Sequence, residues 1–156
     1  FRSLVAGALL HDVGKVEELA VGTTIEYTDI GRLVGHLTLG AIMVKERCDA
    51  LKGFPREKLW LLLHLILSHH GRLEFGSPVR PAIPEALALH HLDNLDAKTV
   101  AASRCISEDA DVDRNWTEYS RMLETSLYKT GRALEQALPP GPPDADGPRP
   151  QSGTLF

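Results

Sequence analysis

Residues 9–15 read LLHDVGK, an apolar run that ends in an adjacent histidine and aspartate, with Lys15 following three residues after the aspartate. His11 and Asp12 would pack poorly in a hydrophobic core, because both side chains carry polar atoms that need partners. Imidazole nitrogen and carboxylate oxygen together suit Mn, Fe, Co, Ni or Zn, whereas Mg and Ca gather mostly oxygen ligands. The stretch therefore indicates a metal site, although a His-Asp pair by itself is a weak signal.

Four more candidate ligands follow along the chain: His36, His69, His70 and Asp93. His69 and His70 end an apolar segment, where burying two imidazoles without partners would cost about 1 to 3 kcal/mol each. Binding a metal ion would satisfy both rings. The alternative is one core histidine bonded to a backbone carbonyl and one histidine exposed at the helix end. His36 taken alone is more often a core histidine whose hydrogen bonds are satisfied.

The spacing of His11 and Asp12 favours two metal ions rather than one. Adjacent helical residues point about 100° apart, so this pair flanks a site better than it chelates a single ion. A carboxylate that bridges two ions about 4 Å apart accommodates that spread, and such a pair of ions stabilises both oxygens of a phosphoryl displacement. Lys15 could neutralise a bound phosphate, or it could be an ordinary surface lysine.

Asp93 lies in a helical segment on one face with His90 and Asp96, at three-residue spacing. One carboxylate can bind an ion while a neighbour orients it. An ordinary solvated helix face is the equal alternative.

Apolar residues recur at helical spacing along most of the chain. The predicted helices are 2–13, 31–51, 56–70, 84–107 and 116–137. Residues 56–70 are apolar on nearly all sides, which predicts a buried central helix. Residues 21–29 favour a loop or short extended piece, and 72–84, rich in Gly and Pro, a loop long enough to be functional. The predicted class is an all-α helical bundle.

Composition predicts one globular domain with a tail. The chain has 156 residues, of which 43% are hydrophobic and 24% charged, and we assign residues 1–138 to the domain. Residues 139–156, dominated by Pro, Gly and Asp, are predicted to be disordered. A net charge of −4 argues against broad electrostatic capture of nucleic acid. The first residue, Phe1, stands inside an apolar helical pattern without a capping signal, so we expect an N-terminally truncated fragment.

The cysteine spacing and the absence of a signal peptide or membrane-spanning segment in this sequence predict a cytoplasmic protein. Cys48 and Cys105 lie far apart without CxxC spacing, which predicts neither a disulfide nor a thiolate zinc site. No signal peptide opens the sequence, and the apolar run 59–67 is too short to cross a bilayer. We therefore expect a soluble protein without a membrane partner.

The order HD, H, HH, D resembles the HD-domain metal-dependent phosphohydrolases. More narrowly, LLHDVGKVEEL, YTDIGRLVGHLTLG, LILSHHGRLEFGSP and EALALHHLDNLDAK are similar to the HD domain of the YhaM-type 3′→5′ exoribonucleases, over residues from about Ala6 to Thr130. This resemblance implies a nearly all-helical HD-domain bundle. It also implies an N-terminal OB-fold domain and a preceding helix with a metal-binding histidine, both outside this sequence.

The resemblance further implies two divalent ions, with Mn²⁺ favoured and Fe, Co, Ni or Zn as alternatives. His11, Asp12 and Asp93 would hold one ion together with the histidine of the preceding helix. Asp12 would bridge to a second ion, whose remaining ligands are imidazoles: His36, His69 and His70.

Three functions are compatible with these observations. The first is a 3′→5′ exonuclease acting on single-stranded RNA, with Asp12 and Lys15 as catalytic residues; whether it also acts on single-stranded DNA is left open. The second is a phosphohydrolase of a nucleotide or cyclic dinucleotide, although the GYP signature of cyclic-dinucleotide enzymes is replaced by EFGSP, residues 74–78. The third is a non-catalytic helical module that binds nucleic acid or a protein partner. Six separated groups compatible with one site favour an enzyme.

Overall fold

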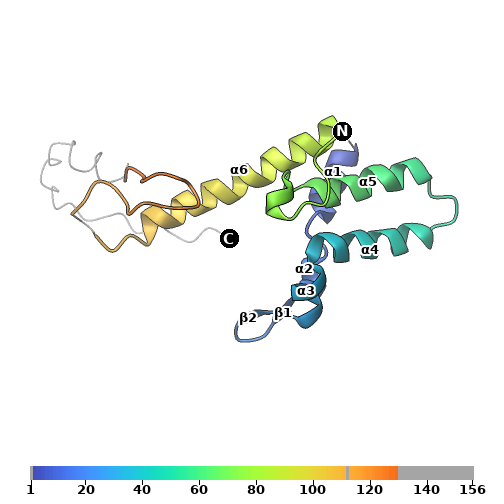
Figure 1. The fold of residues 1–156 in the computed structure, drawn as a ribbon, viewed down its shortest axis with the longest axis horizontal. Coiled ribbons are helices and arrows are strands. Elements are labelled where there is room, and N and C mark those ends of the chain that lie inside the picture. Colours follow the sequence, from blue (N-terminus) through green and yellow to red (C-terminus); the bar gives the residue numbers. More distant parts are fainter. Residues whose placement is uncertain (1, 112, 130–156) are drawn as a thin grey trace, which may run out of the picture. The chain divides into compact units, whose positions relative to one another are not determined.

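The computed structural model describes residues 2–111 and 113–129 (Figure 1). Over these residues the chain divides into two compact units, with the division between residues 99 and 100. Helices make up most of the regular structure: α1 Arg2–Leu10, α2 Lys15–Glu18, α3 Asp29–Val34, α4 His36–Asp49, α5 Arg56–Ser68 and α6 Pro84–Ser107. The all-α class predicted from the sequence is confirmed.

Helix α5 is the central helix of the first unit. It packs against α1 and α4, and Figure 1 shows α4 and α5 side by side. Leu65 and Ile66 of α5 are completely buried; Ile66 packs in a cluster with Val44, and Leu65 in a second cluster with Leu89 of α6. Burying a side chain of this size stabilises the fold by roughly 1.5 to 3 kcal/mol. The predicted central helix is present, but it is buried mainly in its last turns, whereas Trp60 near its start is 58% exposed.

The sequence predicted one helix over 31–51, and this is wrong, because the structure breaks it into α3 and α4 at Gly35. Gly35 has φ +77° and ψ 152°, a conformation that other residues rarely adopt, and it ends α3. His36 thereby becomes the first residue of α4. Its backbone N–H, which has no partner within the helix, donates to Glu18 Oε1 at 3.0 Å. The break therefore fixes the position of His36.

Two connections complete the first unit. Strands β1 (Leu19–Val21) and β2 (Ile25–Tyr27) pair antiparallel, which confirms the expected short extended piece. The loop after α5 contains a 3-10 helix, Leu73–Phe75. Its far end is held by Ala82, whose N–H donates to His64 Nε2 at 2.9 Å. The loop predicted over 72–84 is thus ordered against α5.

In the second unit, the helix predicted over 116–137 is wrong as far as residue 129. Backbone hydrogen bonds instead pair residues 115–117 with residues 127–129: Thr117 N donates to Leu127 O and Lys129 N donates to Asn115 O, both at 2.9 Å. Lys129 is buried, and its ammonium donates to Asp109 Oδ1 at 2.6 Å. These tertiary partners outweigh the helical periodicity of the segment. Residues 130–137, the predicted domain end at 138 and the predicted tail 139–156 lie outside the described residues.

Both cysteines are free, as predicted. Over the described residues, no helix is long and apolar enough to cross a membrane.

Candidate metal centre

His11 and Asp12 lie in a tight turn, residues 11–14, between α1 and α2. His11 N donates to Gly7 O at 2.7 Å, and Lys15 N donates to Asp12 O at 2.9 Å. Gly14 is buried against the start of α4, where an added Cβ would lie 2.0 Å from the backbone oxygen of His36. Glycine therefore lets this turn approach the helix that begins with His36, which gives the HDVGK spacing a structural reason.

His69 and His70 follow the last residue of α5, and α6 supports the turn that they form. His90 of α6 donates from Nδ1 to the carbonyl oxygen of His69 at 2.9 Å, which satisfies one of the unpaired carbonyls at this helix end. Gly71 ends the turn with φ +79°, and an added Cβ there would lie 2.3 to 2.4 Å from atoms of the His90 ring. The turn requires glycine for its conformation and for this contact.

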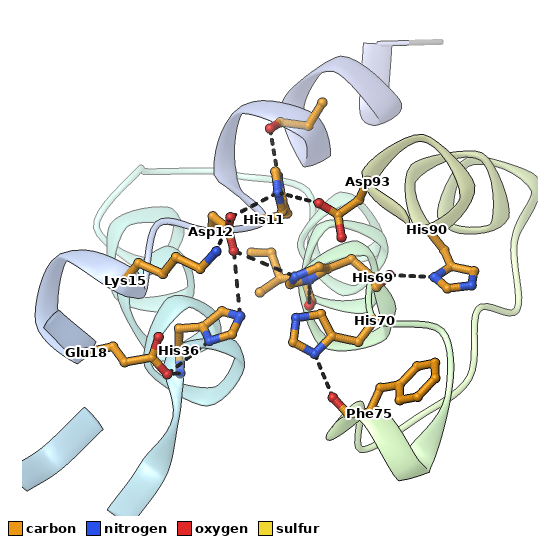
Figure 2. A network of polar contacts seen from close by, with 12 residues as sticks. His11, Asp12, Lys15, Glu18, His36, His69, His70, Phe75, His90 and Asp93 are labelled. Atoms are coloured by element: carbon orange, nitrogen blue, oxygen red, sulfur yellow. Dashed lines mark hydrogen bonds and ion pairs between the residues drawn. The ribbon is translucent and has the colours of Figure 1, made fainter. Parts of the chain in front are cut away.

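These segments converge on the carboxylate of Asp12 (Figure 2). Oδ1 of Asp12 lies 3.6 Å from His36 Nε2 and 3.8 Å from His69 Nε2, and Oδ2 lies 3.3 Å from His11 Nε2. On the other side, His11 Nε2 lies 3.6 Å from Asp93 Oδ1. The ring centroids of His36 and His70 are 5.1 Å apart. We name the six residues the metal centre: His11, Asp12, His36, His69, His70 and Asp93.

The four imidazoles of the metal centre share one orientation. Each directs Nδ1 to an oxygen that accepts a hydrogen bond: His11 to Ala8 O (2.8 Å), His36 to Glu18 Oε1 (3.0 Å), His69 to Ile66 O (2.6 Å) and His70 to Phe75 O (2.8 Å). A carbonyl or carboxylate oxygen has no hydrogen to give, so Nδ1 carries the proton. Nε2 of the neutral ring then presents a lone pair to the centre, as a metal-binding histidine does.

Two atoms of the centre test whether a metal ion fits. Asp12 Oδ1 and His36 Nε2 are buried, and neither has a hydrogen-bond partner in the part of the chain that the structure describes. Two acceptors facing each other at 3.6 Å cannot satisfy one another without a cation. The ligand atoms form two groups, and within each group all atoms lie within 4.8 Å of one another. The first group is His36, His69 and His70, and the second is His11, Asp12 and His69. The cluster can hold a divalent metal ion.

The protonation states of His69 and Asp12 also favour metal binding. Burial lowers the pKa of His69 to about 4, so this imidazole is neutral at neutral pH. Burial would raise the pKa of Asp12, but hydrogen bonds from the protonated His11 ring and from Lys15 outweigh burial and hold that pKa below its usual value. The hydrogen bond with Asp12 raises the pKa of His11. Asp12 and His69 are therefore already in the form that binds a metal ion, whereas the protonated His11 ring must lose the proton on Nε2 before it can bind one.

The structure thus brings together all six residues that the sequence singled out as ligands. Lys15 lies beside them, with Nζ 2.7 Å from Asp12 Oδ2. Asp96 is exposed, which agrees with the alternative of a solvated helix face.

Glu18 is a residue of the candidate site that sequence reasoning missed. Glu18 is 7% exposed, and its Oε1 accepts from both the backbone N and the Nδ1 of His36. A carboxylate behind a metal-binding imidazole fixes the ring and raises its basicity. Nothing in the sequence separates Glu18 from the exposed Glu17 beside it, because the contact depends on the break at Gly35.

Comparison with known proteins identifies one matching family and several similar proteins. The HD domain family matches residues 2–98. The 3′-5′ exoribonuclease YhaM of Bacillus subtilis is 43% identical over 103 residues, and the proteins of the same name from Bacillus velezensis and Geobacillus sp. are 43% and 41% identical over 103 and 105 residues. These matches cover 66 to 67% of this chain and 32% of each relative, so the chain spans about a third of their length. No solved structure matches it.

The family match covers the whole of the metal centre, from His11 to Asp93. It also covers Gly14, Glu18 and Gly71, whose contacts shape that centre. The helical fold and the converging histidines and aspartates agree with this match. The chain therefore belongs to the HD-domain family.

Proposed function

We propose that this chain is the hydrolytic domain of a metal-dependent phosphodiesterase that removes nucleotides from the 3′ end of single-stranded RNA. The observation that carries the proposal is the unpartnered pair Asp12 Oδ1 and His36 Nε2 in the midst of three more inward-facing imidazoles. The names of the YhaM relatives support the direction and the RNA substrate. An RNA substrate also supports a cytoplasmic location.

We propose that the metal centre would hold two divalent ions, with Asp12 as a ligand of both. His36, His69 and His70 form one group of ligand atoms, and His11, Asp12 and His69 form the other, with Asp93 Oδ1 3.6 Å from His11 Nε2. In this proposal His69 would serve the first ion. Mixed nitrogen and oxygen donors favour Mn²⁺ over Mg²⁺ or Ca²⁺ and leave Fe, Co, Ni and Zn as alternatives. When bound, the ions lower the pKa of water and stabilise charge on a phosphoryl oxygen.

The side chains have separate tasks in this proposal. Asp12 stays ionised and faces both ligand groups, so its two oxygens set the spacing of the site. Lys15 is 46% exposed and bonded only to Asp12 Oδ2 in the described contacts, so its ammonium can turn toward a phosphate oxygen as negative charge develops there. His69, neutral and buried, remains a ligand throughout.

The test uses the intact protein, stripped of metal and then supplied with Mn²⁺. Its substrate is single-stranded RNA labelled at the 5′ end, beside a copy blocked at the 3′ end, single-stranded DNA and a cyclic dinucleotide. We expect shortening of the unblocked RNA from its 3′ end only after Mn²⁺ is added. Cleavage of the cyclic dinucleotide alone would support the second enzymatic function and refute ours. Binding of RNA without any cleavage would identify a non-catalytic module.

Replacing Glu18 with alanine should weaken metal binding, because the ring of His36 loses the carboxylate that orients it. Loss of such an outer partner typically costs 10- to 100-fold in affinity, and we expect about that loss by calorimetry with Mn²⁺. Glu17→Ala, at an exposed neighbouring position, is the matched control and should bind normally. Equal affinities of the two variants would show that Glu18 does not support the site.

Replacing His90 with leucine should weaken metal binding by a similar factor, roughly 10- to 100-fold, because the turn of His69 and His70 loses its support. Asparagine places an N–H donor where His90 has Nδ1, so His90→Asn should retain most of the affinity. His91→Leu, on the exposed neighbouring residue, is the control. If His90→Asn binds as weakly as His90→Leu, the hydrogen bond to His69 is not the cause.

A further inference from the structure

The loop after α5 carries an exposed aromatic residue whose backbone is hydrogen-bonded to the metal centre. Phe75 is 60% exposed, although its backbone oxygen accepts the hydrogen bond from Nδ1 of His70 (Figure 2). The guanidinium carbon of Arg72 lies 5.8 Å from the centroid of the Phe75 ring. Because so much of the residue remains exposed, the guanidinium does not cover the ring. We name these two side chains the Arg72–Phe75 platform.

The backbone under the platform is held in place by its own hydrogen bonds. Phe75 N and Ser77 N both donate to Arg72 O, at 3.1 and 3.2 Å, and Gly76 N donates to Leu73 O at 3.0 Å. Gly76 reverses the chain with φ +89°. The backbone that carries the exposed ring is therefore held in place beside His70, rather than on a free loop.

We propose that the Arg72–Phe75 platform binds a nucleobase of the RNA beside the phosphate that is cleaved. This inference rests on the proposed function and adds the part of the substrate that the metal centre cannot hold. Unpaired bases stack on aromatic rings and on guanidinium planes, and such stacking tolerates every base. The net charge of −4 makes broad electrostatic capture of RNA weak, so a stacking contact next to the centre supplies affinity that charge does not.

Two other arginine–aromatic pairs in the described chain provide a comparison. Arg32 lies 5.9 Å from the Tyr27 ring, and Arg56 lies 5.5 Å from the ring of Trp60, which is 58% exposed. Trp60 precedes His69 by nine residues, which is about 13 Å along a helix at 1.5 Å per residue. Only the Phe75 pair has a hydrogen bond to a residue of the metal centre among the contacts described. Trp60 is therefore the matched control.

The first test measures steady-state kinetics of the intact protein with Mn²⁺ on a short single-stranded oligoribonucleotide. Phe75→Leu keeps an apolar side chain and the backbone oxygen but removes the aromatic face. We expect KM to rise about 5- to 150-fold, the value of one stacked base, with kcat within about twofold of wild type. Phe75→Trp should retain the wild-type KM, and Trp60→Leu should leave both constants unchanged. A fall in kcat with unchanged KM would indicate a structural effect on His70 and overturn the proposal.

The second test removes the base instead of the ring. Oligoribonucleotides with an abasic residue at the last or the penultimate position are compared on wild type and Phe75→Leu. For one of the two positions, the abasic substrate should raise KM of wild type by the factor that Phe75→Leu shows, and Phe75→Leu should add nothing further. Equal effects of Phe75→Leu on all substrates would overturn the inference. Since wild type must first hydrolyse RNA, failure of the proposed function would show separately, as absence of hydrolysis by wild type.

Discussion

Asp12→Ala should abolish hydrolysis of RNA, with a loss greater than the roughly 1000-fold that removal of one electrostatic group can cause. Asp12 faces His11 through Oδ2 and both His36 and His69 through Oδ1, so its removal affects both groups of ligands at once. The variant should also bind fewer ions. Single-turnover hydrolysis and calorimetry with Mn²⁺ measure the two effects on the same preparation.

Two further variants separate this effect from general loss of a charge. Lys15→Ala should cost roughly 100- to 1000-fold, because one transition-state charge is lost while the ligands remain. Asp49→Ala removes a carboxylate that pairs with Lys45 on the surface of α4, and it should leave the rate unchanged. Near-normal turnover or full metal occupancy in Asp12→Ala would refute the assignment.

Gly14→Ala should destabilise the first unit severely. The added Cβ would lie 2.0 Å from His36 O and 2.6 Å from Gly40 N, and both atoms belong to the backbone, which cannot rotate away as a side chain could. Overpacking of a core typically costs 1 to 3 kcal/mol, and a backbone clash is expected at or beyond about 3 kcal/mol. For a unit of this size, that corresponds to a melting temperature lower by about 12 °C or more.

Thermal unfolding followed by circular dichroism measures this prediction. Gly22→Ala is the matched control, since a Cβ there would meet its nearest neighbour, Thr24 O, at an ordinary 3.8 Å. We expect the melting temperature of Gly22→Ala to stay within a few degrees of wild type. Equal stability of Gly14→Ala and Gly22→Ala would mean that the turn carrying Asp12 does not lie against α4 as the structure has it.

The helices with a continuous helical periodicity and clear end signals could be predicted from the sequence alone. The periodicity of 56–70 and 84–107 corresponds to α5 and α6, whose residues Leu65 and Leu89 pack together in the core. The break at Gly35 could not be predicted, because a glycine inside a periodic segment is compatible with a helix until a partner such as Glu18 holds the next residue. The structure of residues 116–129 could not be predicted either, because it too depends on a tertiary contact: Lys129 pairs with Asp109, which is distant in the sequence.

The metal centre, too, could be predicted from the sequence only in part. His11, Asp12, His69 and His70 stand out in the sequence because polar groups at the ends of apolar segments need partners. His36 and Asp93 follow from the order of the motifs, and the structure brings all six residues together. Glu18 and the contact from His90 to His69 depend on tertiary placement, so neither role follows from spacing. The assignment of each residue to a particular ion remains a prediction.

Anomalous diffraction at the manganese absorption edge, from crystals of the protein grown with Mn²⁺, tests the central claim most directly. We expect one manganese peak about 2 Å from Nε2 of His36, His69 and His70. We expect a second peak within bonding distance of His11, with Asp12 within bonding distance of both peaks. A fully occupied manganese peak elsewhere in the molecule, with none within bonding distance of Asp12, would contradict it.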